Sequence, residues 1–436
     1  MRFTIETLGC KVNQYESHAL ETLLRANGHE FVRGDCDVAI VNTCAVTGES
    51  ARKSRQAARR LRREHPGALI VVTGCLSQIS PEETAAIGAD LVTGSGDRAK
   101  LVLDIEQLIS DRAKLTAKKR VTLQSRVKVR ELTREFESLP SGGVSGRTRA
   151  MLKLQDGCDN FCAYCVIPLA RGRVRSLPLE QAAAEAAKLE RAGYREVVIT
   201  GIEISSYGKD LDGVTLPDVL RAVSAAAPNL RLRLSSLEPS VLTRELCDEL
   251  AALPNLCDHF HLSLQSGCDT TLRRMRRKYN TQRFLEVARR LRERFPNCGM
   301  TADLIAGFPG ETEDDFADTL AFLGQCAFSG LHVFPYSERP ETAAAAMPDK
   351  LTNEVKARRA AAARAVGRRT EREFLAAQVG RRLEVLFEDA ENGVWTGHAG
   401  NYCRVRVTSA ENLHNTVANV LIKGVAGGEL FGELDI

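Results

Sequence analysis

The chain has 436 residues, of which 27% are charged and 44% hydrophobic, and its formal net charge is +4. This apolar fraction is typical of globular proteins, so the composition excludes fibrous and intrinsically disordered classes. No run approaches the roughly 18 consecutive apolar residues of a membrane span, and no signal peptide is visible. We therefore expect a cytoplasmic protein without membrane association, whose 13 cysteines are more often metal ligands or catalytic groups than disulfides.

Basic residues are concentrated in three runs. Residues 52–63 hold seven Lys or Arg and no acid, residues 273–278 read Arg-Arg-Met-Arg-Arg-Lys, and residues 356–372 hold seven bases and one acid. Such runs are often solvated helix faces. Three of them in one chain also favour a polyanionic partner, because clustered Lys and Arg bind phosphate backbones by counterion release. Nucleic acid is therefore a hypothesis for the partner.

The first 110 residues alternate short apolar runs with helical stretches. We expect strands at residues 3–7, 38–41 and 69–73, and helices at residues 15–25 and 50–64. This order predicts a small parallel α/β domain over residues 1–112. Residues 113–143 are rich in Lys and Arg and lose the periodicity, and the Gly- and Ser-rich residues 141–146 follow. We expect a basic linker there.

A longer alternation defines the second predicted domain, residues 144–375. Strands are expected at residues 152–155, 196–200, 230–235, 259–264, 300–305 and 331–334. Helices are expected at residues 179–192, 216–226, 240–250, 281–294 and 313–324. Five strand–helix repeats that lead into a sixth strand predict a partial (βα)6 barrel, with functional groups at the carboxyl ends of its strands.

The last part of the chain changes character again. A long Ala- and Arg-rich helix is expected from Thr352 to about Gln378, and residues 376–436 then form the third predicted domain. Short strand-like runs at residues 383–387, 403–407 and 417–422 are separated by glycines. This pattern predicts a small closed β-barrel, an architecture often used on nucleic acid.

Three cysteines form a CxxxCxxC motif directly after the first strand of the central domain: Cys158, Cys162 and Cys165. Thiolates suit iron–sulfur clusters or zinc. Three protein ligands leave one metal position open, which is the arrangement of a reactive centre. A zinc knuckle completed by a remote ligand, or loop cysteines without metal, are the alternatives, and the spacing favours a catalytic metal loop.

A second set of cysteines is dispersed in the sequence but equivalent in position. Cys10, Cys44 and Cys75 each follow one of the three expected N-terminal strands by one to three residues. Loops at the carboxyl ends of neighbouring parallel strands converge on one crevice, so we expect the three thiols to meet there. Singly, each of them is more often a small buried hydrophobe. The other seven cysteines show no ligand spacing.

These motifs resemble those of the radical S-adenosylmethionine methylthiotransferases. The resemblance rests on CxxxCxxC, on the N-terminal segments Leu-Gly-Cys-Lys-Val-Asn-Gln-Tyr-Glu-Ser, Asn-Thr-Cys-Ala-Val-Thr and Thr-Gly-Cys-Leu-Ser-Gln, and on a C-terminal segment similar to the RNA-binding TRAM domain. Lys11 after the first cysteine, and the run from Gln155 to Cys162, are similar to the branch that modifies threonylcarbamoyladenosine in tRNA. The other two branches modify isopentenyladenosine in tRNA or an aspartate of a ribosomal protein.

The resemblance implies a set of cofactors and residue roles. Cys158, Cys162 and Cys165 would hold a [4Fe–4S] cluster that binds and cleaves S-adenosylmethionine, and Cys10, Cys44 and Cys75 would hold a second [4Fe–4S] cluster that presents the sulfur. Tyr164 is expected near the cofactor's adenine. Further candidates for the S-adenosylmethionine pocket are Glu203, Gln265, Asp303 and Gly307, although core turns are an equal alternative for the last three.

The resemblance also implies partners. The substrate would be an adenosine in the anticodon loop of tRNA, modified at C2, and single-stranded loop bases are accessible to an enzyme that needs such contact. An electron donor such as flavodoxin or ferredoxin and a sulfur source would be required. Two alternatives stay open: another branch of the family, and a zinc-dependent RNA-binding protein without catalysis.

Overall fold

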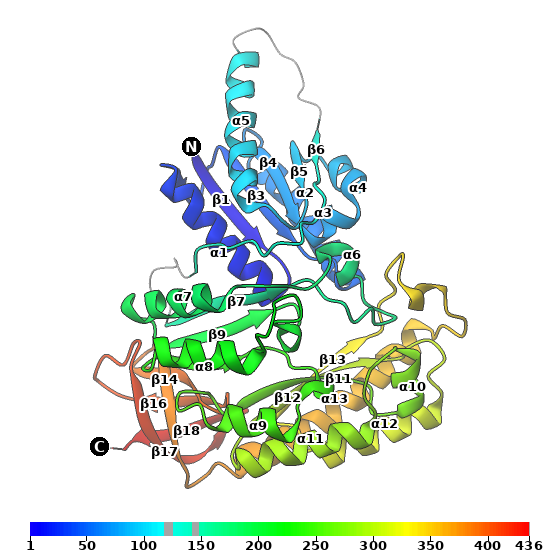
Figure 1. Cartoon of the computed structure of the whole chain (residues 1–436), viewed down its shortest axis with the longest axis vertical. Coiled ribbons are helices and arrows are strands. Elements are labelled where there is room, and N and C mark those ends of the chain that lie inside the picture. The colour runs from blue at the N-terminus through cyan, green and yellow to red at the C-terminus, as the bar shows by residue number, and fades with distance from the viewer. Residues whose placement is uncertain (117–124, 142–147, 436) are drawn as a thin grey trace.

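The computed structural model describes residues 1–116, 125–141 and 148–435. Figure 1 shows an α/β domain at the N-terminus that stands on a partial barrel, with a small β-barrel at the C-terminus packed against the lower side of the partial barrel. The Gly- and Ser-rich segment proposed as linker lies almost entirely outside the described residues. The predicted fold class is confirmed, whereas the predicted domain boundaries stay a prediction.

The N-terminal sheet is parallel throughout, and the order of its described strands is β2-β1-β3-β4-β5-β6. The strand bounds are β1 Arg2–Thr7, β2 Glu30–Phe31, β3 Val38–Thr43, β4 Leu69–Gly74, β5 Leu91–Thr93 and β6 Arg126–Lys128. The three expected strands are β1, β3 and β4. Strands β2, β5 and β6 were missed because runs of two or three residues carry no periodicity.

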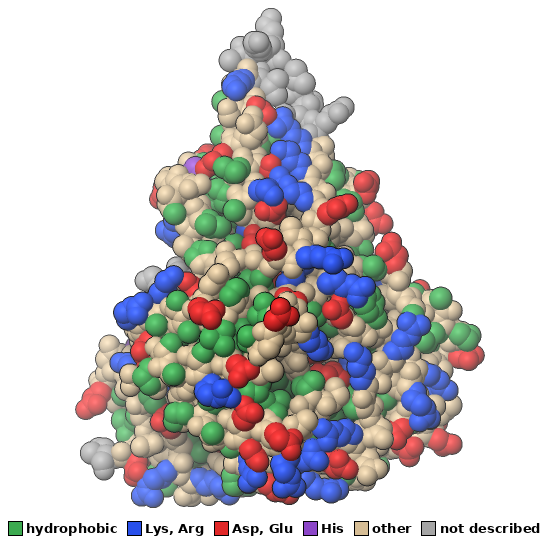
Figure 2. Space-filling view, viewed as in Figure 1, with side chains coloured by type: hydrophobic (Ala, Val, Ile, Leu, Met, Phe, Trp, Pro, Cys, Tyr) green, Lys and Arg blue, Asp and Glu red, His purple; other side chains and the backbone are tan. Residues whose placement is uncertain are grey.

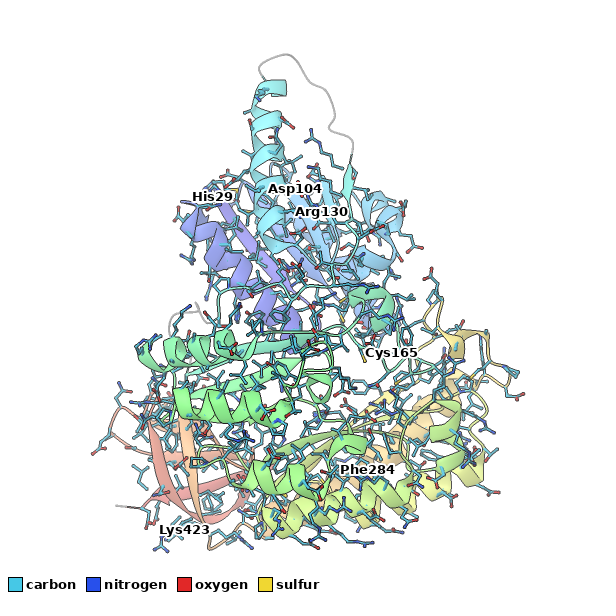
Figure 3. The ribbon with its side chains drawn as sticks, in the orientation of Figure 1. His29, Asp104, Arg130, Cys165, Phe284 and Lys423 are labelled. Carbon is cyan, nitrogen blue, oxygen red and sulfur yellow. The ribbon has the colours of Figure 1, made fainter. Side chains whose placement is uncertain are left out.

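Helices cover both faces of this sheet. They are α1 Lys11–Ala26, α2 Gly48–Glu64, α3 Cys75–Ile79, α4 Pro81–Ala86 and α5 Arg98–Thr116. Leu20 of α1 and Ile105 of α5 belong to the core on one face, and Leu61 of α2 belongs to the core on the other. Strand β6 lies in the predicted linker and is held to α5 by two ion pairs of Asp104, with Lys128 at 2.7 Å and Arg130 at 2.6 Å (Figure 3).

The central domain contains the six expected parallel strands. Its strands are β7 Arg149–Asp156, β8 Arg175–Ser176, β9 Glu196–Gly201, β10 Arg231–Leu234, β11 His259–Gln265, β12 Gly299–Ala306 and β13 Gly330–Pro335. They form two sheets in the described residues, β10-β9-β7-β8 and β11-β12-β13, with β8 antiparallel to β7. Isolated bridges Leu232–Leu256 and Leu237–Leu262 connect the sheets, so the whole is an open barrel.

The helices of this domain lie outside the barrel. They are α6 Ile167–Arg171, α7 Leu179–Arg191, α8 Leu216–Ala226, α9 Arg244–Ala251, α10 Asp269–Arg274, α11 Thr281–Arg294, α12 Glu313–Cys326 and α13 Asn353–Ala376, with the 3-10 turns η1 Ile204–Ser206, η2 Pro239–Val241 and η3 Ala343–Ala346. Successive strand residues point to opposite faces. Leu152, Ile199 and Leu262 therefore join the core under the helices, where Phe284 also lies (Figure 3), and the alternate residues face the barrel interior.

The C-terminal domain is a closed barrel with the order β14-β15-β16-β18-β17. Its strands are β14 Arg382–Glu391, β15 Val394–Ala399, β16 Arg404–Thr408, β17 Val417–Ala426 and β18 Glu429–Leu434. Phe387 is fully buried in its core, and Trp395 packs against that core. In the described part of the chain, no helix is long and apolar enough to span a membrane.

The three basic runs are partly engaged in contacts within the chain. Arg62 of α2 pairs with Asp90, Arg277 pairs with Glu238, and Arg359 of α13 pairs with Glu311 at 2.7 Å. On the face shown in Figure 2, Lys and Arg side chains are interspersed with Asp and Glu over the lower helices. The runs therefore contribute to the fold as well as to the surface.

Candidate active site between two cysteine triads

The N-terminal triad lies at the carboxyl edge of the sheet. Cys10 precedes the first residue of α1, Cys44 follows β3, and Cys75 is the first residue of α3. Each thiol interacts electrostatically with another member of the set, so the fold brings the three together. Cys10 is exposed, whereas Cys44 and Cys75 are buried.

Glycine makes this close approach of the loops feasible. Gly9 has a φ of +107°, and a Cβ at that position would lie 2.9 Å from Cys44 Sγ. The buried Asn13 side chain donates hydrogen bonds to Leu8 O at 2.7 Å and to Thr43 O at 2.9 Å. It thereby fixes the loops before Cys10 and Cys44 relative to each other.

The second triad lies on the loop that leaves β7. Gly157, with a φ of +70°, passes so close to Arg173 O that a Cβ would lie 1.8 Å from it. Cys158 N donates to Gly172 O at 3.0 Å, and Ala163 N donates to Met275 O at 3.0 Å. The loop is thus anchored on both sides, and Figure 3 shows Cys165 at the level where the N-terminal domain meets the barrel.

Burial disfavours the free thiolate at Cys10, Cys44, Cys75, Cys158 and Cys165. Burial raises the pKa of Cys158 to about 11 and that of Cys165 to about 12, and burial also raises the pKa of Cys44 and Cys75. Metal binding must displace these protons. Among the described residues, no three His, Cys, Asp or Glu side chains are placed to hold a single metal ion.

One buried arginine contacts each triad. Arg171 Nε donates to Cys75 Sγ at 3.2 Å, and Arg277 Nη1 donates to Cys162 Sγ at 3.1 Å. The side chain of Arg171 is fully buried and that of Arg277 is 5% exposed. Hydrogen bonds to ligand sulfurs are among the factors that set the properties of iron–sulfur clusters, so these two contacts suit thiolates that hold such clusters.

Arg171 belongs to a buried ion network, which we call the junction network: Glu16, Arg98, Lys153, Asp156, Arg171 and Arg175. Glu16 of α1 accepts from Arg171, from Arg98 at 2.8 Å and from Lys153 at 3.2 Å. Lys153 also pairs with Asp156 at 3.1 Å. Although burial alone would raise it, these cations lower the pKa of Glu16 to about 2. The network joins the N-terminal domain to the barrel.

The junction network carries more positive than negative charge. It holds the four cations Arg98, Lys153, Arg171 and Arg175 against the two carboxylates of Glu16 and Asp156. Since Arg171 is both a member of the network and in contact with Cys75, the excess positive charge lies beside the N-terminal triad. Burial raises the pKa of the Cys75 thiol, and Arg171 partly opposes this effect.

The remaining predicted pocket residues lie at or near strand ends. Tyr164 packs against the cluster of Met275, Phe308 and Tyr336, and its hydroxyl lies 3.4 Å from Arg277 Nη1. Gln265, at the end of β11, has a φ of +65°, which is uncommon for a residue other than glycine. Their roles toward S-adenosylmethionine stay a prediction.

Three further candidates have contacts of different kinds. Glu203 follows β9, and its carboxylate accepts from Ser205 N at 3.1 Å. Asp303 of β12 pairs with His261 at 3.2 Å. A Cβ on Gly307 would lie 2.4 Å from Lys356 Cγ, so this glycine has a packing role beside α13. Their assignment to the cofactor also stays a prediction.

The sequence alone does not identify Arg171 and Arg277 as residues that contact the triads. Arg277 lies in a basic run that we related to a polyanion, and Arg171 lies in the segment after the cysteine loop. Their contacts with sulfur join residues 115 and 96 positions apart. A charged residue in an otherwise apolar short helix is the only local signal for Arg171.

We predict that Arg171→Met destabilises the protein by about 3–5 kcal/mol, because it breaks a fully buried ion pair and removes one of the three cations that neutralise Glu16. Urea unfolding at pH 7 measures this. The matched control is Arg173→Met, whose side chain is 67% exposed in a pair with Asp159, and a change within about 0.5 kcal/mol is expected for it. Equal effects of the two substitutions would contradict the structural role of the network.

A second prediction concerns Glu203. Its pKa is raised from 4.5 to about 7, mainly by burial and to a smaller extent by the nearby carboxylate of Glu238. Between these two pH values the folded state keeps a proton that the unfolded state has released. The stability that this proton contributes is complete below pH 4.5 and is lost as the pH rises to about 7. Relative to Glu203→Gln, the wild type should lose about 3 kcal/mol over this window.

Urea unfolding of the two proteins between pH 5 and pH 8 measures this difference. The control is Glu64→Gln at an exposed carboxylate, which should keep the pH profile of the wild type. A difference between wild type and Glu203→Gln that is constant across this range would show that Glu203 has an ordinary pKa.

Comparison with known proteins gives matches to both cysteine-bearing domains. Residues 152–323 match the radical SAM superfamily, and residues 2–94 match the uncharacterized protein family UPF0004. The threonylcarbamoyladenosine tRNA methylthiotransferase MtaB of Bacillus subtilis is 38% identical over 95% of this chain and 92% of its own length. The tRNA-2-methylthio-N(6)-dimethylallyladenosine synthase of Syntrophobacter fumaroxidans is 33% identical over 99% of this chain and 95% of its own length.

Solved structures agree on the fold. The radical S-adenosylmethionine methyltransferase TsrM of Kitasatospora setae superposes with a TM-score of 0.57 at 17% identity, covering 79% of this chain and 74% of that chain. At this identity the similarity shows the fold alone. The full-length similarity to curated relatives shows more: the chain belongs to the radical SAM tRNA methylthiotransferases.

Proposed function

We propose that the protein inserts sulfur and a methyl group at C2 of N6-threonylcarbamoyladenosine next to the anticodon of tRNA, which gives 2-methylthio-N6-threonylcarbamoyladenosine. The observation that carries this proposal is the meeting of two cysteine triads from separate domains at the mouth of one barrel, each with an arginine on one sulfur. Relatives that are 34–39% identical over most of the chain and bear the name of this activity support it.

The two triads suit different tasks. Cys158, Cys162 and Cys165 would hold a [4Fe–4S] cluster and Cys10, Cys44 and Cys75 a second one, and three thiols leave one position for a further ligand in each. When bound, the clusters and S-adenosylmethionine supply the one-electron chemistry that activates an inert C–H bond, the sulfur and the methyl group.

The chain itself supplies position and protection. The junction network fixes the N-terminal domain on the barrel, so the distance between the two triads is set by buried contacts rather than by a flexible link. Tyr164 and Arg277 close the inner side of the cysteine loop. Tyr164, Glu203, Gln265, Asp303 and Gly307 are the residues that we propose for the S-adenosylmethionine pocket.

We infer the remaining partners from the reaction. The C-terminal barrel, as a TRAM domain, and the exposed Arg368 and Arg372 of α13 would bind tRNA phosphates. An electron donor such as flavodoxin or ferredoxin and a source of sulfur are required. Because its substrate is tRNA, we place the protein in the cytoplasm. The family membership removes the alternative of a zinc-dependent RNA-binding protein without catalysis.

The decisive test is the nucleoside composition of tRNA. In a strain that lacks this protein, threonylcarbamoyladenosine should lack its methylthio group while methylthio-isopentenyladenosine is unchanged. Mass analysis of digested tRNA measures both. Loss of the second nucleoside instead of the first would assign the protein to the other tRNA branch, which also has relatives that match nearly the whole chain.

Substitutions should separate the roles of the two triads. Cys158→Ala should abolish cleavage of S-adenosylmethionine, whereas Cys44→Ala should leave cleavage measurable but stop sulfur insertion. Each variant should bind about half of the iron of the wild type, because each retains one triad. The readouts are 5′-deoxyadenosine, methylthio product and iron per chain.

The matched control is Cys36→Ala, at a buried cysteine of the N-terminal domain that lies outside both triads. It should keep full iron and both reactions. If folded Cys158→Ala and Cys44→Ala proteins lost the two reactions equally, the division of labour between the triads would be wrong.

A further inference from the structure

A cavity of about 470 Å³ lies where all three domains meet. Lys11 and Gln14 of α1 line it from the N-terminal domain, Arg149 of β7 and Arg233 of β10 line it from the inner face of the barrel, and Tyr402 lines it from the C-terminal barrel. Cavities of this size, with a few convergent polar groups, are typical ligand sites.

Both arginines on the cavity wall are paired with carboxylates. Arg149 pairs with Glu388 at 3.0 Å, and Arg233 pairs with Glu196 at 2.7 Å. Asp303, which interacts with Lys11 electrostatically, pairs with His261. Lys11 itself is exposed, and within the described residues it makes no ion pair or side-chain hydrogen bond. Among the described residues, therefore, no carboxylate forms an ion pair with this ammonium group of the cavity.

One carboxylate on the wall, Asp389, also lacks an ion pair among the described residues. It lies on an exposed part of β14, and it is not within ion-pair distance of Lys11. Among charged groups, the repulsion of Lys11 by Arg233 and by Arg149 comes first, ahead of its attraction to Glu196 and Asp303. An anion in the cavity would relieve this repulsion, because each cation gains from a nearby negative charge.

The wall around Lys11 is rigid. The Tyr402 ring stacks between His259, at 4.6 Å and 20°, and His398, at 5.0 Å and 26°. The Arg233 guanidinium lies 4.9 Å from the centre of the same ring and donates to Gly400 O at 2.8 Å. A group bound in this cavity would meet side chains that are already held in place, which favours selectivity.

We propose that this cavity binds the N6 substituent of the substrate adenosine and that Lys11 pairs with the carboxylate of that substituent. The proposal rests on the function proposed above and names the residue that selects the substrate. The threonylcarbamoyl group ends in a carboxylate and carries a hydroxyl and amide-type groups, for which Lys11, Gln14 and Tyr402 offer partners. An isopentenyl group offers no charge and would leave the ammonium unpaired.

The position of Lys11 is consistent with this role. It directly follows Cys10 of the N-terminal triad, and β7 runs from the wall of the cavity at Arg149 to the loop of Cys158. An anion held at Lys11 therefore belongs to a molecule that lies beside the N-terminal triad. The substituent would enter the barrel interior while the adenine ring stays at the mouth.

Binding of anticodon stem-loop RNAs to the holoenzyme tests the proposal. The three RNAs carry threonylcarbamoyladenosine, unmodified adenosine or isopentenyladenosine at the same position. Lys11→Met should lower the affinity for the first RNA by roughly 10-fold to 100-fold, the range for a lost charged hydrogen bond, and leave the other two unchanged. Lys100→Met, at an exposed lysine of the same domain, should leave all three affinities unchanged.

Because Lys11 adjoins Cys10, its substitution could also disturb the N-terminal triad, and a second variant at a residue not adjacent to Cys10 controls for this. Gln14→Glu places a carboxylate in the same cavity one turn further along α1, and it should weaken binding of the threonylcarbamoyladenosine RNA alone. Equal losses on all three RNAs would show that Lys11 binds a phosphate, and no loss on any RNA would show that it binds nothing; either result overturns the proposal. Failure of the wild type to methylthiolate the first RNA would instead refute the proposed function, whatever the binding contrast shows.

Discussion

The burial of Glu16 is the constraint on which the arrangement of this molecule depends. Its carboxylate belongs to the N-terminal domain, yet two of its three cationic partners, Arg171 and Lys153, come from the barrel. Among the described residues of the N-terminal domain Glu16 pairs only with Arg98, so it has its full set of cationic partners only when that domain is docked on the barrel. Docking also places Arg171 on Cys75. The same ion network therefore sets the distance between the triads and the electrostatic field at one of them.

The second triad is also contacted by an arginine that pairs with a buried carboxylate, in a smaller set of charged residues. Arg277 bridges Cys162 and Glu238, and the tyrosine hydroxyl of Tyr164 lies beside it. Each triad thus receives one hydrogen bond from a guanidinium that is itself held by a buried carboxylate. Arginine suits this position because it stays charged and its planar group donates in several fixed directions. The two cysteine triads thus have the same kind of guanidinium contact, although their surrounding sequences share only the cysteines.

The sequence predicts the scaffold better than the site. Strands β7 and β9 to β13 follow from apolar runs of ordinary length, and the six triad cysteines follow from their place after strands. Strand β6 could not be predicted, since its three residues carry no periodicity and are held beside β5 by ion pairs of Asp104 and Asp111 on α5. The contacts of Arg171 and Arg277 with sulfur also could not be predicted, because they join residues remote in sequence. The unpaired state of Lys11 is a property of three domains together, and no local pattern encodes it.

The docking of the C-terminal barrel has a consequence for how the enzyme selects a position in RNA. Tyr402 is stacked between two histidines, one of them on β11, and Arg233 of the central barrel donates to the backbone of the turn that carries Tyr402. The C-terminal barrel is therefore fixed to the rest of the molecule and does not act as a loose tether. An RNA held on it would present to the triads only the nucleotide that lies at one set distance from the point of attachment. The fixed distance between the C-terminal barrel and the triads would therefore determine which base of the loop is modified.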